Sequence, residues 1–82
     1  MVTVAYHPRF EKTIRKIRDS QLKERVKHQI IRIIEDPDTG KPMRYARRDT
    51  REVYIPPFRL SYFYDKKQDT IVFLALYHKD EQ

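Results

Sequence analysis

The chain has 82 residues, with 18 Lys and Arg against 12 Asp and Glu, and a formal net charge of +6. A chain of this length forms a single domain over residues 1–82 and buries only about 60–65% of the surface that it exposes when unfolded. Because it contains no cysteine and only one glycine, a disulfide framework, a cysteine nucleophile, a thiolate metal site and a Gly-rich phosphate loop are excluded. It has neither an apolar stretch of about 18 residues nor the apolar run of a signal peptide, so we expect a cytoplasmic protein that binds no membrane.

The N-terminal part predicts a short strand and two helices. Residues 2–6 alternate and are rich in β-branched and aromatic side chains, which is typical of a strand. Pro8 suits the first turn of a helix of about ten residues. An N-cap candidate at Asp19-Ser20 precedes a second helix, over residues 21–35. Each helix has one apolar stripe, formed by Phe10, Ile14 and Ile17 in the first and by Leu22, Val26, Ile30, Ile33 and Ile34 in the second.

The C-terminal part predicts a loop and then three strands. Residues 36–42 hold the only glycine and two of the five prolines, which favours a loop, and residues 43–45 are expected to be briefly extended. The strands are expected at 51–55, 58–64 and 70–77, followed by a polar tail. The last strand is almost wholly apolar, which predicts a central strand covered on both faces.

The resulting fold class is α+β, with the order βααβββ. A two-helix hairpin is expected to pack on one face of a small, mainly antiparallel twisted sheet. The two-helix crossover after the first strand permits parallel pairing with a later strand. The other face of the sheet remains available for function.

Positive charge is concentrated in one segment outside the helices. Five cations stand between positions 41 and 51, where Asp49 is the only acid. Four of the five are arginines, whose planar guanidinium suits phosphate. This segment favours binding of a polyanion such as RNA, and the alternative is a charged surface that only keeps a small protein soluble. The candidate RNA-binding residues are Lys41, Arg44, Arg47, Arg48 and Arg51.

Strand alternation predicts which side chains share the open face. Val53 and Ile55 should face the helices, so Glu52 and Tyr54 should face away from them. Arg59 is the only charged residue within its strand. It is either a cation at a concave anion site or an edge arginine whose stem packs on tyrosines. In the same strand, Tyr62 and Tyr64 are expected to lie in the core.

Histidine is the side chain whose pKa suits proton transfer near neutral pH. His78 follows the last predicted strand, next to Lys79, and is either a general acid or base or a solvated terminal residue. His7, beside a proline, and His28, on a helix flank, are expected to be structural. Because the three histidines are far apart in the sequence, we predict no metal and no cofactor.

Several short segments together resemble the RelE/ParE superfamily of type II toxins. They are the opening His7-Pro8-Arg9-Phe10-Glu11-Lys12, the segment Gly40-Lys41-Pro42-Met43-Arg44, the strand Phe58-Arg59-Leu60-Ser61-Tyr62 and the ending Val72-Phe73-Leu74-Ala75-Leu76-Tyr77-His78-Lys79, in this order. Each segment is short, so their order carries the specificity, and the resemblance covers nearly the whole chain.

The resemblance implies a toxin that inhibits translation by cutting mRNA on the ribosome. It implies a metal-independent endoribonuclease that a cognate antitoxin silences in a hetero-oligomer. Arg59 matches the family's phosphate-binding arginine, and His78 and Lys79 match basic positions after the last strand. The candidate catalytic residues are Arg59, His78, Lys79, Glu52 and Tyr54.

The resemblance also leaves two other functions open. ParE-like members poison DNA gyrase without cleaving RNA, and a degenerate toxin would only bind antitoxin. RelE carries two lysines on the strand where this chain has Glu52 and Tyr54. A glutamate there is either a general base or an indication of a different site.

Overall fold

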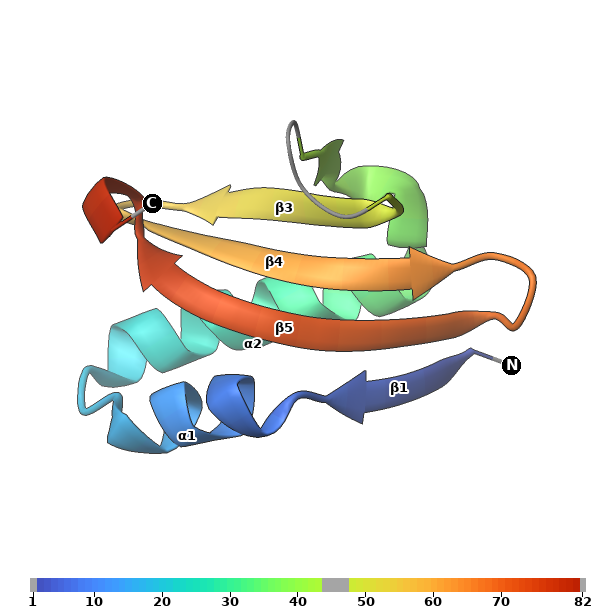
Figure 1. Ribbon diagram of the computed structural model, residues 1–82. Coiled ribbons are helices and arrows are strands. Elements are labelled where there is room, and N and C mark those ends of the chain that lie inside the picture. Colours follow the sequence, from blue (N-terminus) through green and yellow to red (C-terminus); the bar gives the residue numbers. More distant parts are fainter. Residues whose placement is uncertain (1, 44–47, 82) are drawn as a thin grey trace.

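The computed structural model describes residues 2–43 and 48–81 and shows two helices packed against a five-stranded sheet (Figure 1). The strands lie in the order β1-β5-β4-β3-β2. β1 pairs with β5 in parallel, and the other neighbours are antiparallel. The elements are β1 (Thr3–Tyr6), α1 (Pro8–Lys16), α2 (Ser20–Glu35), η1 (Pro37–Thr39), β2 (Lys41–Pro42), β3 (Thr50–Ile55), β4 (Phe58–Asp65), β5 (Thr70–His78) and η2 (Lys79–Glu81). The predicted α+β class and element order are confirmed, and β1 makes the parallel pairing that the two-helix crossover permits.

Both helices begin at residues that cap them. The Nδ1 atom of His7 accepts a hydrogen bond from the backbone N–H of Arg9 at 3.1 Å, and Pro8 occupies the first helical position. The Asp19 carboxylate accepts from the N–H groups of Gln21 and Leu22 at 2.9 and 3.3 Å. These side chains satisfy N–H groups that the helices leave without partners.

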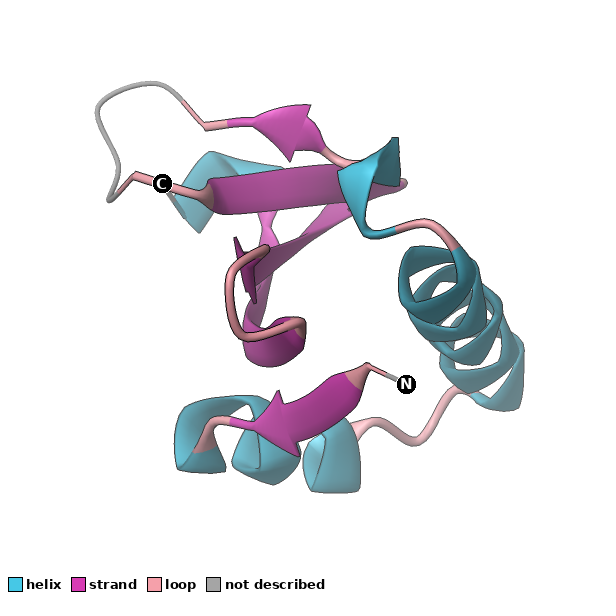
Figure 2. Ribbon diagram, turned by 90° about the vertical axis from the view of Figure 1, so that its right-hand side faces the viewer, coloured by secondary structure: helices cyan, strands magenta, loops and turns pink. Residues whose placement is uncertain are grey.

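The core lies between the helices and one face of the sheet. Phe10 of α1 stacks on Phe73 of β5, with ring centroids 5.7 Å apart, and Val26 and Ile33 are the most deeply buried residues of α2. Figure 2 shows α2 on one side of the curved sheet, so that the opposite face is not covered by a helix. The expectation that the last strand is covered on both faces is therefore wrong, and its buried residues alternate with half-buried ones.

Two features of the sheet differ from the sequence prediction. The segment expected to be a loop contains β2, in which Lys41 pairs with Glu52 and Pro42 with Arg51. β5 extends to His78, which is therefore the last residue of a strand rather than the start of a tail. The proline and glycine in this segment favour a loop, and a two-residue edge strand is too short to show an alternating pattern. The sequence therefore gave no sign of β2.

A buried phenol of the central strand, β4, fixes the segment that leads into β2. The Tyr62 hydroxyl accepts a hydrogen bond from the backbone N–H of Gly40 at 2.8 Å and donates one to the Pro37 carbonyl at 2.7 Å. Tyr62 has no exposed surface, and this burial raises the pKa of its hydroxyl. A side chain at position 40 would collide with the Tyr62 ring and hydroxyl, so glycine is required there by close packing.

Candidate active site on the uncovered sheet face

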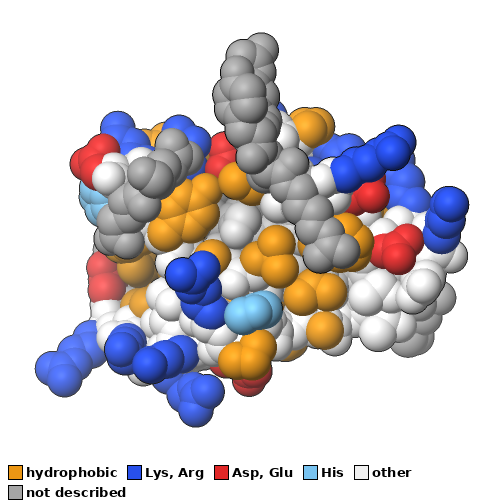
Figure 3. Space-filling model, in the orientation of Figure 1, with side chains coloured by type: hydrophobic (Ala, Val, Ile, Leu, Met, Phe, Trp, Pro, Cys, Tyr) orange, Lys and Arg blue, Asp and Glu red, His pale blue; other side chains and the backbone are white. Residues whose placement is uncertain are grey.

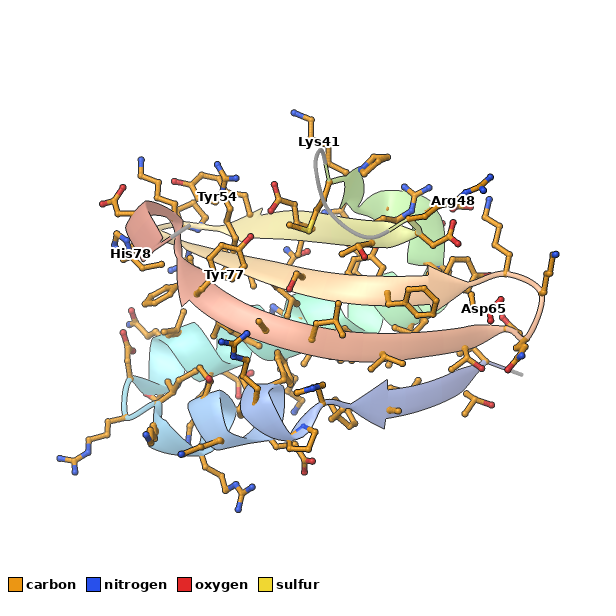
Figure 4. All side chains as sticks on the ribbon, in the orientation of Figure 1. Lys41, Arg48, Tyr54, Asp65, Tyr77 and His78 are labelled. Atoms are coloured by element: carbon orange, nitrogen blue, oxygen red, sulfur yellow. The ribbon has the colours of Figure 1, made fainter. Side chains whose placement is uncertain are left out.

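A hollow of about 220 Å³ opens on the uncovered face of the sheet. It is lined by Lys41, Glu52, Tyr54 and Arg59, which come from β2, β3 and β4. In Figure 4, Lys41, Tyr54 and Tyr77 are labelled on this side of the molecule. The hollow therefore contains cations, a carboxylate and a phenol within one small volume.

The strand register brings these side chains together. Lys41 lies opposite Glu52 across β2 and β3, and Tyr54 lies opposite Arg59 across β3 and β4. Directly opposed residues of an antiparallel pair place their side chains on the same face. Val53, between Glu52 and Tyr54, packs against the core instead, which confirms the predicted faces of this strand.

Glu52 is held by two donors from two other strands. Arg59 donates from Nη1 to Oε1 of Glu52 at 3.1 Å, and the two side chains form an ion pair. Tyr77 of β5 donates its hydroxyl proton to the other oxygen, Oε2, at 3.0 Å. The Glu52 side chain is 18% exposed and that of Arg59 is 33% exposed, so the carboxylate lies deeper than the guanidinium.

Tyr77 is a site residue that sequence reasoning missed, and a β-bulge explains why. The register between β4 and β5 pairs Ser61 with Ala75 but Tyr62 with Phe73, so Leu74 is an extra residue. Uninterrupted alternation from the buried Phe73 would turn Tyr77 toward the helices. The bulge reverses the alternation, so Leu76 is buried and Tyr77 faces the hollow.

The same bulge separates His78 from Arg59. His78 lies opposite Phe58, whereas Arg59 lies opposite Tyr77, so His78 and Arg59 face opposite sides of the sheet. The His78 ring contacts Phe58 edge-on, with centroids 5.6 Å apart, and its Nδ1 accepts from the N–H of Asp80 at 3.3 Å. The structure therefore does not bring these two candidate catalytic residues together on one surface.

Lys79 also lies apart from the hollow. It begins η2 and is exposed, and its backbone N–H donates to the Pro57 carbonyl at 3.1 Å. Within the described ranges, no three His, Asp or Glu side chains are placed so that they could bind a metal ion.

The basic segment is divided between several environments. Arg51 donates to the carbonyls of Gly40 and Asp38 at 2.7 and 3.2 Å and pairs with the Asp38 carboxylate at 3.2 Å. Its guanidinium therefore holds η1 and the following Gly40 against β3. Lys41 lines the hollow, and Arg48 is exposed in the turn before β3. The remaining two candidates, Arg44 and Arg47, lie outside the described residues.

Figure 3 shows the uncovered face with hydrophobic side chains across its middle and Lys and Arg mainly toward its margin. Phe63 and Val72 lie opposite each other there and are half-buried. Among the described residues, the cations that line the hollow are Lys41 and Arg59. The positive charge is thus local, rather than spread over the whole face.

A second and larger concavity, of about 770 Å³, lies along the two helices. Its floor includes Phe10, Ile14 and Val26, and the exposed side chains of Tyr6 and Ile31 lie beside them. Four charged residues line it, namely Glu11, Arg15, Lys23 and Lys27. The groove is therefore apolar at its base and carries more basic than acidic groups at its rim.

No helix in the described part of the chain is long and apolar enough to cross a membrane.

Comparison with known proteins agrees with this architecture. Residues 4–82 match the family described as the ParE toxin of the type II toxin–antitoxin system parDE. The chain therefore belongs to the ParE toxin family, within the RelE/ParE superfamily. The chain is therefore a toxin of a type II toxin–antitoxin system, as the sequence resemblance implied. No curated protein matches the chain at a significant level.

Solved structures with the same fold include RelE toxins and their complexes with antitoxins. The toxin–antitoxin complex RelBE from E. coli superposes with a TM-score of 0.80 at 18% identity, covering 95% of this chain and 96% of that one. A RelBE complex from Mycobacterium tuberculosis gives 0.78 at 22% identity, covering 95% and 98%. The archaeal RelE–RelB complex from Pyrococcus horikoshii gives 0.76 at 13% identity, covering 99% and 98%. At these identities the likeness establishes the fold.

Proposed function

We propose that this toxin is an endoribonuclease that cleaves mRNA on the ribosome, and that its active site is the hollow around Glu52. The observation that carries the proposal is the arrangement of one carboxylate, one guanidinium and two phenols from three adjacent strands. A general base, a phosphate-binding cation and proton donors are the groups that cleavage of a phosphodiester needs.

The reaction starts at the 2′-hydroxyl of the RNA. Glu52 accepts its proton, the 2′-oxygen forms a bond to the adjacent phosphorus, and the bond from phosphorus to the 5′-oxygen breaks. Arg59 stabilises the charge that develops on the phosphate oxygens. The leaving 5′-oxygen takes a proton from Lys41 or Tyr54, which line the same hollow. The products are a 2′,3′-cyclic phosphate and a 5′-hydroxyl.

The test is to map mRNA ends after the toxin is induced in growing cells. Cleavage within translated codons that is lost in Glu52→Gln supports the proposal. Glu24→Gln, on the exposed surface of α2, is the control because it removes the same charge far from the hollow. Intact mRNA with the unsubstituted toxin refutes ribonuclease activity.

Inhibition of DNA gyrase is the second candidate, because the family that matches the chain is named for the ParE toxin. In this alternative the pairing of Arg59 with Glu52 is only structural. The same induced cells separate the two functions, since DNA breaks with intact mRNA support gyrase inhibition and codon-specific cleavage with intact DNA supports the ribonuclease.

We further propose that an antitoxin segment binds the groove along the two helices. The groove has an apolar floor and a rim with three cations and one carboxylate, which complements an acidic amphipathic helix. The fold neighbours from E. coli and Pyrococcus horikoshii are toxin–antitoxin complexes, which supports an antitoxin partner for this chain. Ribosome and mRNA are the proposed targets of the free toxin in the cytoplasm.

A further inference from the structure

The Arg59 guanidinium is already paired with a carboxylate in the free protein. Its Nη1 atom lies 3.1 Å from Oε1 of Glu52, on the face where RNA would have to bind. A phosphodiester that approaches Arg59 therefore meets a neighbouring negative charge. Like charges within a few ångströms oppose each other, and this repulsion weakens the binding of the anion.

Tyr77 holds the same carboxylate from the other side. Its hydroxyl donates to Oε2 at 3.0 Å, so the two oxygens of Glu52 are bonded to donors on different strands. If Arg59 turns from Oε1 to a phosphate oxygen, the bond to Tyr77 keeps Glu52 in the hollow. The exchange then releases one carboxylate oxygen, the atom that can accept a proton.

We propose that Glu52 masks the anion site of Arg59 until a phosphodiester displaces it, and that Tyr77 positions the displaced carboxylate. This proposal rests on the proposed ribonuclease site and adds a regulatory step to it. The phosphodiester exchanges places with Glu52 at Arg59, and the same exchange frees the base. The Glu52 carboxylate is thus paired with Arg59 when RNA is absent and is free to accept a proton when RNA is bound.

The exchange is tested by binding rather than by cleavage. The probe is a short RNA whose 2′-hydroxyls are all methylated, so that it cannot be cut, and its binding is measured by fluorescence anisotropy at low salt. We expect Glu52→Gln to bind the probe about tenfold more tightly than the unsubstituted protein, which corresponds to a like-charge interaction of roughly one pKa unit. Glu24→Gln, which makes the same change in net charge, should bind with unchanged affinity.

A double-substitution cycle shows whether Arg59 is the masked cation. In an Arg59→Ala background, Glu52→Gln should give no gain in affinity. The proposal is overturned if Glu52→Gln still raises the affinity when Arg59 is absent, or if Glu24→Gln raises it equally. It is also overturned if Glu52→Gln binds the probe no more tightly than the unsubstituted protein, which includes the case in which neither of these two proteins binds it. Tyr77→Phe should leave the affinity within about twofold and should change the pH profile of cleavage, whereas a purely structural role would lower the cleavage rate equally at every pH.

The outcomes separate the mask from the proposed catalysis. If Glu52→Gln binds RNA more tightly through Arg59 and the unsubstituted toxin cleaves no mRNA, the mask stands and the ribonuclease is refuted. If Glu52→Gln abolishes cleavage without any change in binding, the general base stands and the mask is refuted.

Discussion

Arg59 and Tyr77 lie directly opposite each other across β4 and β5, and each donates a hydrogen bond to a different oxygen of Glu52. A single carboxylate on β3 is thereby tied to β4, its neighbour in the sheet, and to β5, the strand beyond β4. This relationship gives the uncovered face a fixed polar centre.

Arg59 and His78 should contribute unequally to cleavage. Arg59→Ala removes the cation that we propose stabilises the phosphate, and loss of such a charge-stabilising donor costs about 10² to 10³ in rate. His78→Ala should keep the rate within a few-fold, because His78 faces the opposite side of the sheet. Primer extension on translated mRNA measures both variants. Equal and complete loss in His78→Ala would show that the histidine reaches the site in the ribosome-bound toxin.

Lys41 should contribute to the salt dependence of RNA binding. Each neutralised phosphate releases condensed counterions, so affinity falls linearly with salt concentration on logarithmic axes. Lys41→Ala should reduce the magnitude of that slope by about one. Lys67→Ala is the control, because this exposed lysine lies in the turn between β4 and β5 and does not line the hollow. A slope near zero for the unsubstituted protein would contradict a contact led by phosphate.

Gly40 should tolerate no side chain. A Cβ atom at this position meets the Tyr62 ring and hydroxyl, and overpacking of this kind costs typically about 1–3 kcal/mol. Urea unfolding of Gly40→Ala should therefore show a lower free energy of unfolding. Lys41→Ala, at an exposed position next to it, should stay within about 0.5 kcal/mol of the unsubstituted protein. Equal stability of both variants would mean that the backbone moves away without cost.

Tyr62 should make the fold sensitive to alkali. Burial raises the pKa of its hydroxyl, so the folded state holds the proton more tightly than the unfolded state. This contribution to stability is fully present below the pKa of an unfolded tyrosine, about 10, and is lost as the pH rises through the raised pKa of the folded state. Tyr62→Phe removes this part of the pH dependence.

The same variant should also be less stable at neutral pH. Without the hydroxyl, the Gly40 N–H and the Pro37 carbonyl lose their partner, and an unsatisfied buried group costs about 1–3 kcal/mol. Tyr54→Phe, at a residue that is 53% exposed, is the control. It should change neither the free energy of unfolding at neutral pH nor its decrease at alkaline pH. Chemical unfolding at several pH values measures both effects.

Ile31 should be important for antitoxin binding and unimportant for stability. It is 44% exposed and lines the helix groove, so Ile31→Asp places a charge where an apolar contact is expected. The cognate antitoxin should bind this variant at least tenfold more weakly, while its unfolding curve stays the same. His28→Asp, another exposed position of α2 that does not line the groove, should bind normally. Normal binding by Ile31→Asp would place the antitoxin elsewhere.

The sequence by itself determined the helices, the three long strands and their order, because apolar periodicity and capping residues act locally. Asp19 and Pro8 mark the helix starts, and alternation around Val53 correctly assigned the faces of Glu52 and Tyr54. The resemblance to the RelE/ParE superfamily rested on the same local segments, and the family match agrees with it.

Only the tertiary structure decided which residues meet in the hollow. The extra residue in β5 reverses the alternation beyond it, turning Tyr77 toward Glu52 and His78 away from Arg59. The contacts of Arg51 with the carbonyls of Asp38 and Gly40 could not be read from its segment either, because they depend on where η1 and the start of β2 lie against β3, and the role of Arg51 in RNA binding stays a prediction. Strand register and bulges arise from pairing between segments far apart in the chain, so no local pattern contains them.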